Sequence, residues 1–114
     1  MTIRRAVPNI RSESLEESRD FYGLLGFEEV MNLGWVMTLA SPSNPTAQVS
    51  FMTSEDPAEH ADISVEVDDV DAVHAALAAR GAQIVYSLRD EEWGVRRFFV
   101  RDPNGRVINV VQHR

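Results

Sequence analysis

Polar side chains, two of them carboxylates, occupy every second position of one segment that is predicted to be a strand. In DISVEV, Asp62, Ser64 and Glu66 alternate with isoleucine and valine, and successive side chains of a strand point to opposite faces. A carboxylate whose pKa is raised by burial can act as a general base. Asp62 and Glu66 are therefore the candidate catalytic residues. On one face their charges repel, unless an arginine or a cationic ligand lies between them.

Two amides are predicted to lie on the same polar face as these carboxylates. Gln48 lies in AQVSFM, where Val49 and Phe51 form the buried set, and Asn109 lies among apolar residues in VINVV. An amide in a cleft can hydrogen-bond either a ligand or a neighbouring strand. Both interpretations of Asn109 stay open.

Arginine and tryptophan complete the set of candidate ligand-binding residues. Arg96 and Arg97 are consecutive, so one of them faces the cleft, and the sequence does not say which. The cleft-facing arginine would either clamp a ligand carboxylate or pair with Asp62 or Glu66. Trp35 and Trp93 each adjoin a glycine. Each is either a core residue or part of a cleft wall on which a flat ligand stacks.

The composition limits the partners and the location. The chain has 114 residues, a formal net charge of −7 and no cysteine. The length predicts one domain, and the negative charge argues against nucleic acid and anionic membranes. The absence of cysteine excludes disulfides and thiolate metal sites. No apolar run approaches the length of a membrane span, and MTIRRAVPNI lacks the apolar segment of a signal peptide. We therefore expect a cytoplasmic protein.

The chain contains an internal repeat. VPNIRSESLEESRDFYGLLGFEEV, from Val7, aligns without a gap with DISVEVDDVDAVHAALAARGAQIV, from Asp62, an offset of 62 − 7 = 55. The same offset places Gly26 on Gly81, where each glycine is expected to end a helix. Each segment predicts a strand, an amphipathic helix and a second strand.

The repeat predicts the elements of each half. Ser14 or Glu13 would cap the first helix, and Asp69 or Asp68 the second. The buried helix faces are predicted to be Leu15, Phe21, Tyr22 and Leu25 in the first half, and Val70, Val73, Leu77 and Ala78 in the second. Beyond the helices, the expected strands are 27–32, 35–40 and 47–52, then 83–88, 94–101 and 106–112. The result is a single α+β domain of two βαβββ repeats, about 1–52 and 62–114, joined by a linker at 53–61.

These patterns resemble the vicinal oxygen chelate superfamily, which includes glyoxalase I, extradiol dioxygenases and bleomycin-resistance proteins. The resemblance is carried by ESRDFYGLLGFEEV, DISVEVDDVDAVHAALAARGA and RRFFVRDPNGRVINVV, which span most of the chain. It implies a curved, eight-stranded mixed sheet with the helices on its convex side and a ligand cleft on its concave side. It also implies a homodimer, since small members of the superfamily usually dimerise to complete the cleft.

The resemblance also implies where a metal would bind. Carried over by motif, the ligand positions of metal-dependent members fall at Val7, Gln48, Asp62 and Asn109. Valine cannot bind a metal, and two amides with one carboxylate would make a weak divalent site. We therefore expect no metal and no other cofactor.

Two classes of function follow from the lack of a complete set of metal ligands at these positions. The first is a non-catalytic protein, similar to the bleomycin-resistance members, that sequesters a small aromatic or hydrophobic molecule such as an antibiotic. The second is an enzyme of the same superfamily: a metal-dependent lyase or dioxygenase, or a metal-free isomerase, cyclase or hydrolase with Asp62 or Glu66 as its base.

Overall fold

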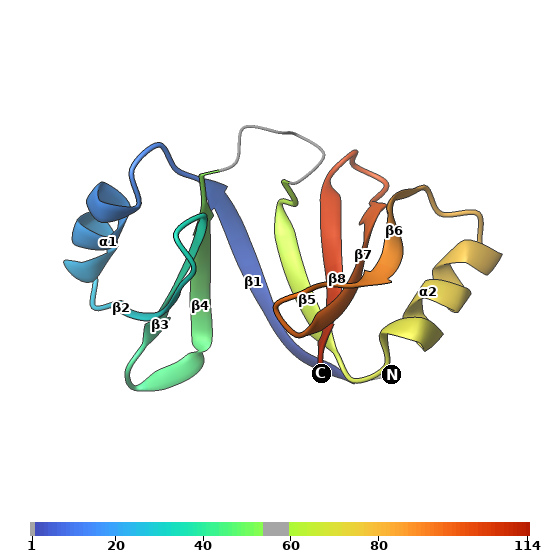
Figure 1. Ribbon diagram of the computed structural model, residues 1–114, viewed down its shortest axis with the longest axis horizontal. Helices are drawn as coiled ribbons and strands as arrows, with labels where there is room; N and C mark the ends of the chain where they lie inside the picture. Colours follow the sequence, from blue (N-terminus) through green and yellow to red (C-terminus); the bar gives the residue numbers. More distant parts are fainter. Residues whose placement is uncertain (1, 54–59) are drawn as a thin grey trace. The chain divides into compact units, whose positions relative to one another are not determined.

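Two runs of five elements follow each other along the chain, each in the order strand, helix, strand, strand, strand (Figure 1). The computed structural model describes residues 2–53 and 60–114. The first run consists of β1 (Ile3–Arg11), α1 (Leu15–Gly23), β2 (Glu28–Asn32), β3 (Val36–Ser41) and β4 (Asn44–Met52). The second consists of β5 (Ile63–Val67), α2 (Val70–Ala79), β6 (Ile84–Asp90), β7 (Val95–Arg101) and β8 (Val107–His113). Across the described residues, these eight strands and two helices confirm the predicted α+β class and the paired βαβββ pattern.

The chain divides into two compact units. The first unit contains Val7–His60, and the second contains Ala61–Arg114 together with Met1–Ala6. The boundary therefore runs through β1, whose first residues belong with the second half of the sequence. Of the predicted linker at 53–61, residues 54–59 lie outside the described residues.

In the first unit, the strands lie in the order β2-β3-β4-β1. The pair β1 and β4 is parallel, whereas β2 with β3 and β3 with β4 are antiparallel. The side chain of Ser14 caps α1 by accepting a hydrogen bond from the Glu17 N–H. The core consists of Met37, Leu39, Val49 and Phe51, against which Leu15, Tyr22 and Phe27 pack.

The predicted buried face of α1 was wrong at two of its four positions. Leu15 and Tyr22 pack on the core, but Phe21 is 62% exposed and Leu25 is 67% exposed. The helix ends at Gly23, so Leu25 lies beyond it in the following turn. Phe21 instead rests edge-on against the ring of Tyr22, with 5.3 Å between the ring centroids.

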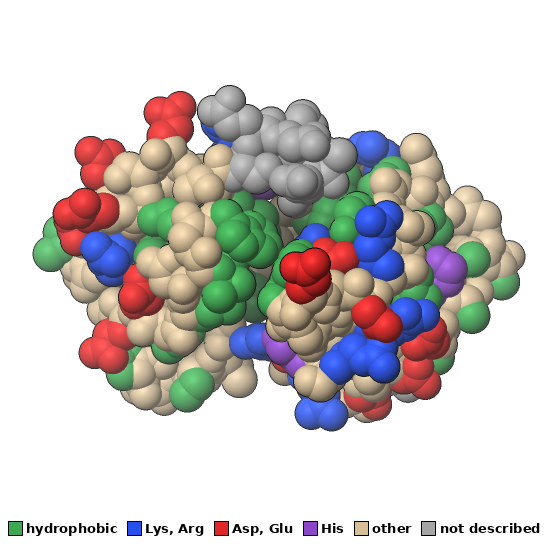
Figure 2. All heavy atoms as spheres, viewed as in Figure 1, with side chains coloured by type: hydrophobic (Ala, Val, Ile, Leu, Met, Phe, Trp, Pro, Cys, Tyr) green, Lys and Arg blue, Asp and Glu red, His purple; other side chains and the backbone are tan. Residues whose placement is uncertain are grey.

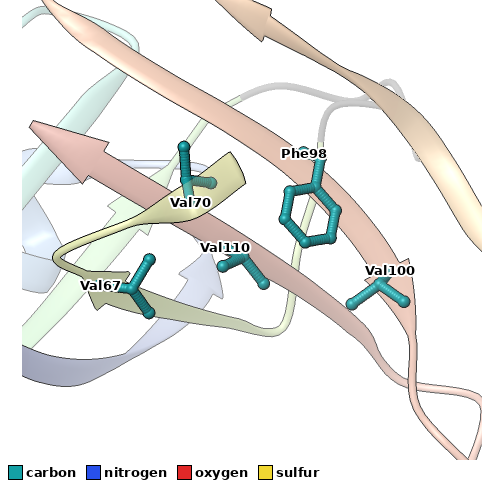
Figure 3. Close-up of a cluster of buried hydrophobic side chains, with 5 residues drawn as sticks. All are labelled: Val67, Val70, Phe98, Val100 and Val110. Carbon is teal, nitrogen blue, oxygen red and sulfur yellow. The ribbon is translucent and has the colours of Figure 1, made fainter. Parts of the chain in front are cut away.

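The second unit repeats this arrangement with the strand order β5-β8-β7-β6, and its pair β5 and β8 is again parallel. The Asp69 side chain caps α2 by accepting the Ala72 N–H. The core cluster is formed by Val67, Val70, Phe98, Val100 and Val110 (Figure 3). Of the predicted helix face, Val73 and Leu77 also pack on this cluster, whereas the small side chain of Ala78, at the end of the helix, is exposed.

The first residues of the chain are tied to the second unit at the start of α2. The Thr2 N–H donates to the Asp68 carboxylate at 2.9 Å, and the Asp68 N–H donates to the Thr2 carbonyl at 3.1 Å. The hydrogen bond from the Thr2 backbone holds the pKa of Asp68 below its ordinary value. This contact explains why Met1–Ala6 belong to the second unit.

Strand register confirms that the two units are repeats. Asn9 lies opposite Ser50 across β1 and β4, and Ser64 lies opposite Asn109 across β5 and β8. The first members of these pairs are related by the sequence offset, 9 + 55 = 64. Among the described residues, neither helix is long and apolar enough to cross a membrane.

Charge is distributed unequally between the units. The first unit holds two arginines against nine acidic residues, and the second holds nine of each, so the formal charge of −7 comes from the first unit alone. On the face drawn in Figure 2, red acidic side chains surround the region of α1, whereas blue and red side chains are interleaved over the second unit.

Candidate functional site

The candidate site lies on the far face of the second unit, which we define as the sheet face opposite α2. Val65, Phe98 and Val110 belong to the cluster beneath α2. Because side chains alternate along a strand, their neighbours point to the far face. These neighbours are Ser64 and Glu66 on β5, Arg97 and Phe99 on β7, and Asn109 and Val111 on β8.

Asn109 occupies the centre of this face. It is 7% exposed, and its amide nitrogen donates to the Ser64 hydroxyl at 3.0 Å. Its amide oxygen is buried and accepts no hydrogen bond from the described residues. The amide nitrogen of Asn109 therefore links β8 to β5, whereas its amide oxygen can still accept a hydrogen bond. A buried acceptor without a partner costs about 1–3 kcal/mol.

The structure distinguishes between the two consecutive arginines. Arg96 points to the α2 side, where its guanidinium contacts Asp71 at 2.9 Å and Asp90 at 3.3 Å. The hydrogen bond from Arg96 lowers the pKa of Asp71, and the same bond raises the pKa of Arg96. Arg97 points to the far face and is 9% exposed. Of the two, only Arg97 can meet a ligand on the far face.

Arg97 is enclosed by aromatic rings. Its guanidinium carbon lies 5.1 Å from the ring centre of Tyr86, 5.0 Å from that of Trp93 and 4.9 Å from that of Phe99. These distances are typical of cation–π contacts. Tyr86 and Phe99 are themselves stacked, with 4.7 Å between the ring centroids. Trp93 is 43% exposed, so part of its ring is accessible.

The charge of Arg97 is balanced within the enclosure. Its guanidinium contacts the Glu91 carboxylate at 3.1 Å, and the side chains of the pair are 11% and 9% exposed. The Tyr86 hydroxyl donates to the same carboxylate at 2.9 Å. The Arg97 Nε–H is nevertheless buried without an acceptor among the described residues. The second unit thus holds an unused donor on Arg97 and an unused acceptor on Asn109.

The predicted repulsion between Asp62 and Glu66 is relieved separately at each residue. Asp62 precedes β5, and its carboxylate accepts the Val107 N–H at 2.9 Å, with the Arg106 guanidinium at 4.0 Å. The carboxylate of Glu66 contacts Arg5 at 2.8 Å and the His113 imidazole at 2.5 Å, and its side chain is 14% exposed. Both carboxylates are thus bound by neighbouring groups of the second unit.

The remaining predicted residues belong to the first unit. The Gln48 amide donates to the Pro45 carbonyl at 2.8 Å, close to the start of β4. The half-buried Trp35 lies just before β3, and its carbonyl accepts the Thr53 N–H at 3.0 Å. At the centre of that unit's sheet, the buried hydroxyls of Thr38 and Ser50 lie 2.8 Å apart.

Sequence reasoning missed Glu91, Tyr86 and Phe99. Glu91 lies two residues before Trp93, and nothing in the local sequence distinguishes it from its neighbour Glu92. Phe99 was detectable, because the turn Asp102–Gly105 makes β7 and β8 a hairpin. Pairing Arg101 with Val107 places Phe99 opposite Asn109, as the structure does.

The positions that correspond to metal ligands do not fit a divalent ion. The Val7 side chain offers no donor atom, and the Gln48 amide nitrogen donates to the Pro45 carbonyl within β4. Asp62 is the one carboxylate at these positions, and it caps the start of β8. Within the described ranges, no three His, Cys, Asp or Glu residues come together as a metal-binding group. Divalent ions in proteins favour several carboxylate and imidazole ligands, whereas these four positions supply one carboxylate and no imidazole.

Comparison with known proteins shows the family. The family model of the Glyoxalase/Bleomycin resistance protein/Dioxygenase superfamily matches residues 4–110. The chain belongs to this superfamily. No curated protein matches the sequence.

Solved structures share the fold at low sequence identity. A glyoxalase/bleomycin resistance protein/dioxygenase superfamily member from Vibrio splendidus is 18% identical, with a TM-score of 0.67 over 97% of this chain and 99% of its own. A methylmalonyl-CoA epimerase from Mycobacterium tuberculosis is 21% identical, with a TM-score of 0.70 over 98% and 87%. A hypothetical protein from Bacillus halodurans is 13% identical, with a TM-score of 0.77 over 100% and 96%. At these identities the likeness concerns the fold.

Proposed function

We propose that this superfamily member binds a small aromatic or hydrophobic molecule, without a metal ion, on the far face of the second unit. Sequestration of such a molecule, for example an antibiotic, would be its role. The observation that carries the proposal is the pair of unused buried atoms, the Arg97 Nε–H and the Asn109 amide oxygen. Aromatic rings beside Arg97 supply the apolar surface of a ligand site.

The two unused atoms favour a ligand with a donor and an acceptor on one edge. Arg97 pairs with Val111, and Asn109 lies two residues before Val111 on β8. Such diagonal neighbours are about 7–8 Å apart between their Cα atoms. A flat molecule with an N–H beside a carbonyl, as in a lactam or carboxamide, would satisfy both and stack on Trp93.

The same contacts favour a neutral ligand. From the sequence, either an arginine or a cationic ligand was expected to separate the charges of Asp62 and Glu66. Glu66 contacts Arg5 and His113, and Glu91 balances Arg97. A cationic ligand would have to displace one of these partners.

The alternative is a metal-free enzyme of the same superfamily. One contact favours it: Glu66 is largely buried and lies 2.5 Å from the His113 imidazole. Such a carboxylate can orient an imidazole for proton transfer. This alternative predicts conversion of the bound molecule, whereas sequestration predicts its recovery unchanged.

The proposal is tested by metal analysis and a thermal-shift screen of small neutral aromatic amides, followed by calorimetry of each hit. Asn109→Ala is expected to weaken binding about tenfold, which corresponds to about 1.4 kcal/mol for one lost hydrogen bond. Asn104→Ala, an exposed amide in the same unit, is the matched control and should bind like the parent.

Two results would contradict the proposal. One is a stoichiometric divalent metal in protein purified without chelator. The other is an Asn109→Ala variant that melts and binds like the parent. Mass spectrometry of the ligand recovered after incubation then separates sequestration from turnover.

We also propose a homodimer and a cytoplasmic location. The dimer is supported by an apolar surface at the end of α1, which we call the α1 patch: Phe21, Leu24 and Leu25. These side chains are 62%, 88% and 67% exposed. Large exposed apolar patches commonly mark interfaces between proteins. The cytoplasmic location rests on the absence of cysteine from the sequence.

A further inference from the structure

Arg89 is a second arginine at the candidate site, and it lies beside Arg97. The two residues are paired directly across β6 and β7, so both side chains point to the far face. The guanidinium carbon of Arg89 lies 4.1 Å from the ring centre of Tyr86, and that of Arg97 lies 5.1 Å from the same point. The two guanidinium carbons are therefore no more than 9.2 Å apart, which is the sum of 4.1 and 5.1 Å.

The two arginines differ in how their charge is balanced. Arg97 is buried, and its guanidinium contacts the Glu91 carboxylate at 3.1 Å. Arg89 is exposed, and its guanidinium donates to the Ser87 hydroxyl at 2.8 Å but contacts no carboxylate among the described residues. Like charges directly opposite each other on two strands repel. Because Glu91 balances Arg97, the charge of Arg89 is the one that lacks a counter-ion.

Neither of the next two carboxylates in the chain is available to Arg89. Asp90 points to the opposite face of the sheet, where two arginines contact it. One oxygen of Glu91 accepts from Arg97 at 3.1 Å, and the other accepts the Tyr86 hydroxyl at 2.9 Å. Arg89, Arg97 and Glu91 together thus carry one net positive charge beside the aromatic rings.

The ring of Tyr86 holds Arg89 in a geometry that suits an anion. A guanidinium is planar, and it can stack on an aromatic face while its N–H groups point outward in its own plane. It has five N–H donors, and the Ser87 hydroxyl is the acceptor for one of them. The remaining donors of Arg89 can form a bidentate pair with a carboxylate.

Arg101 is the other arginine of the far face that contacts no carboxylate among the described residues. It lies four residues from Arg97 on β7, which is about 13 Å along a strand. Its guanidinium donates to the Gly105 carbonyl at 3.0 Å, in the turn before β8. Arg89, directly opposite Arg97, is therefore the arginine that a ligand bound at Arg97 can also reach.

We infer that the ligand of the candidate site is an aromatic amide that also carries a carboxylate, and that Arg89 binds this carboxylate. Arg97 and Asn109 meet the neutral amide edge, whereas Arg89 meets the charge at the rim of the site. A single ring with the two groups at opposite ends is short enough to contact both guanidiniums. The assignment of Arg89 narrows the proposed function, on which it rests, to one class of aromatic molecule.

Three benzamides of the same shape test the charge preference: para-carboxybenzamide, para-carbamoylbenzamide and para-amidinobenzamide, which are anionic, neutral and cationic. Calorimetry is expected to show para-carboxybenzamide binding about fivefold more tightly than the neutral compound, the upper end for an exposed ion pair. Para-amidinobenzamide should bind most weakly, because it brings a like charge to Arg89. Equal affinities for the three compounds would overturn the inference.

Neutral substitutions locate the carboxylate. Arg89→Gln is expected to lower the affinity for para-carboxybenzamide to that for para-carbamoylbenzamide. Arg80→Gln makes the same charge change at the exposed C-cap residue of α2; it is the matched control and should keep the fivefold preference. Equal effects of the two substitutions would overturn the inference. Loss of the preference in Arg101→Gln, with Arg89→Gln unaffected, would place the carboxylate at the wrong arginine and overturn it too.

Asn109→Ala distinguishes a failure of this inference from a failure of the proposed function. It should weaken binding of all three benzamides by the same factor and leave their ratio unchanged, because Asn109 meets the amide that they share. If Asn109→Ala binds all three like the parent, or if none binds the parent saturably at millimolar concentration, both fail. If Asn109→Ala weakens all three but the parent shows no charge preference, only the role of Arg89 is wrong.

Discussion

The two units share one topology but differ in the charge of their side chains. Both have a parallel pair of strands at one side of the sheet, a helix over one face and the same strand order. The first unit nevertheless carries the whole formal charge of −7, whereas the second unit is neutral. The fold therefore depends on the pattern of buried apolar residues, which the units share, and leaves the charge of each unit free to differ.

Equivalent positions on the two sheet faces that lie opposite α1 and α2 show the same divergence. In the first unit, Val36 pairs with Met52 across β3 and β4. In the second, Arg97 pairs with Val111 across β7 and β8. An apolar pair at this position needs only packing, whereas a buried arginine also needs Glu91 and three aromatic rings. A site that recognises polar atoms is thus expected in the second unit.

The largest expected effect is the loss of stability when the buried ion pair of the second unit is broken, compared with an exposed ion pair of the first unit. Glu91→Ala leaves Arg97 buried without its counter-ion and should lower the free energy of unfolding by about 3–5 kcal/mol. Glu29→Ala breaks an ion pair of the first unit, with Arg19 at 3.3 Å and both side chains more than a third exposed, and should cost at most about 1 kcal/mol. Urea unfolding measures both. Similar losses would mean that the Arg97–Glu91 pair is not an exceptional feature of the second unit.

A double variant sharpens this result. Arg97→Met combined with Glu91→Leu replaces the ion pair by apolar groups of similar size. It is expected to recover most of the stability that Glu91→Ala loses, because buried ion pairs are rarely more stable than well-packed apolar residues. No recovery would indicate that the aromatic rings require the guanidinium itself.

A smaller effect is expected on assembly, and it should be specific to the first unit. Leu24→Ser with Leu25→Ser removes two exposed leucines of the α1 patch and should weaken dimerisation by about 2–4 kcal/mol. Val85→Ser, at a 37% exposed position of the second unit, is the control. Sedimentation at micromolar concentration compares the variants. A parent that sediments as a monomer would rule out the dimer.

The smallest expected effect is a change in how stability depends on pH in the acid range. The hydrogen bond from Arg96 places the pKa of Asp71 below its ordinary value of 3.8. The stability from this contact is therefore present above about pH 3.9, the value in the unfolded chain, and is lost as the pH falls through the folded-state value. Asp71→Asn should thus lower the melting temperature slightly at pH 6 and show a shallower decline below pH 4. Parallel curves for parent and variant would contradict this assignment.

Much of the fold followed from the sequence, because the repeat fixes element order and glycine positions. Gly26 and Gly81 were matched by a single offset, and both adopt the positive φ, 111° and 76°, that the end of a helix favours. Strand alternation likewise placed Val49 and Phe51 in the core and Asn109 on the opposite face. These predictions depend on local periodicity, which a sequence states directly.

The site was less predictable, because it depends on which side chains meet across strands. Neither residue number nor type showed that Arg97 contacts Glu91, since β6 pairs with β7 through two irregularities of register. Arg5 lies outside the aligned repeat, which begins at Val7. The repeat therefore could not predict the ion pair between Arg5 and Glu66. Phe21 was misplaced for the same kind of reason: helical periodicity does not state where so short a helix meets its sheet.

The boundary inside β1 has a consequence for dividing this protein. A fragment that begins at Ala61 would keep β5 to β8 and α2, yet it would lack Arg5 and Thr2, which contact Glu66 and Asp68. The complementary fragment would carry those residues without their partners. The first half of the sequence thus contains part of the second unit, and a circular permutant that begins at Ala61 and joins Arg114 through a linker to Met1 would keep residues 1–6 beside the half that they complete.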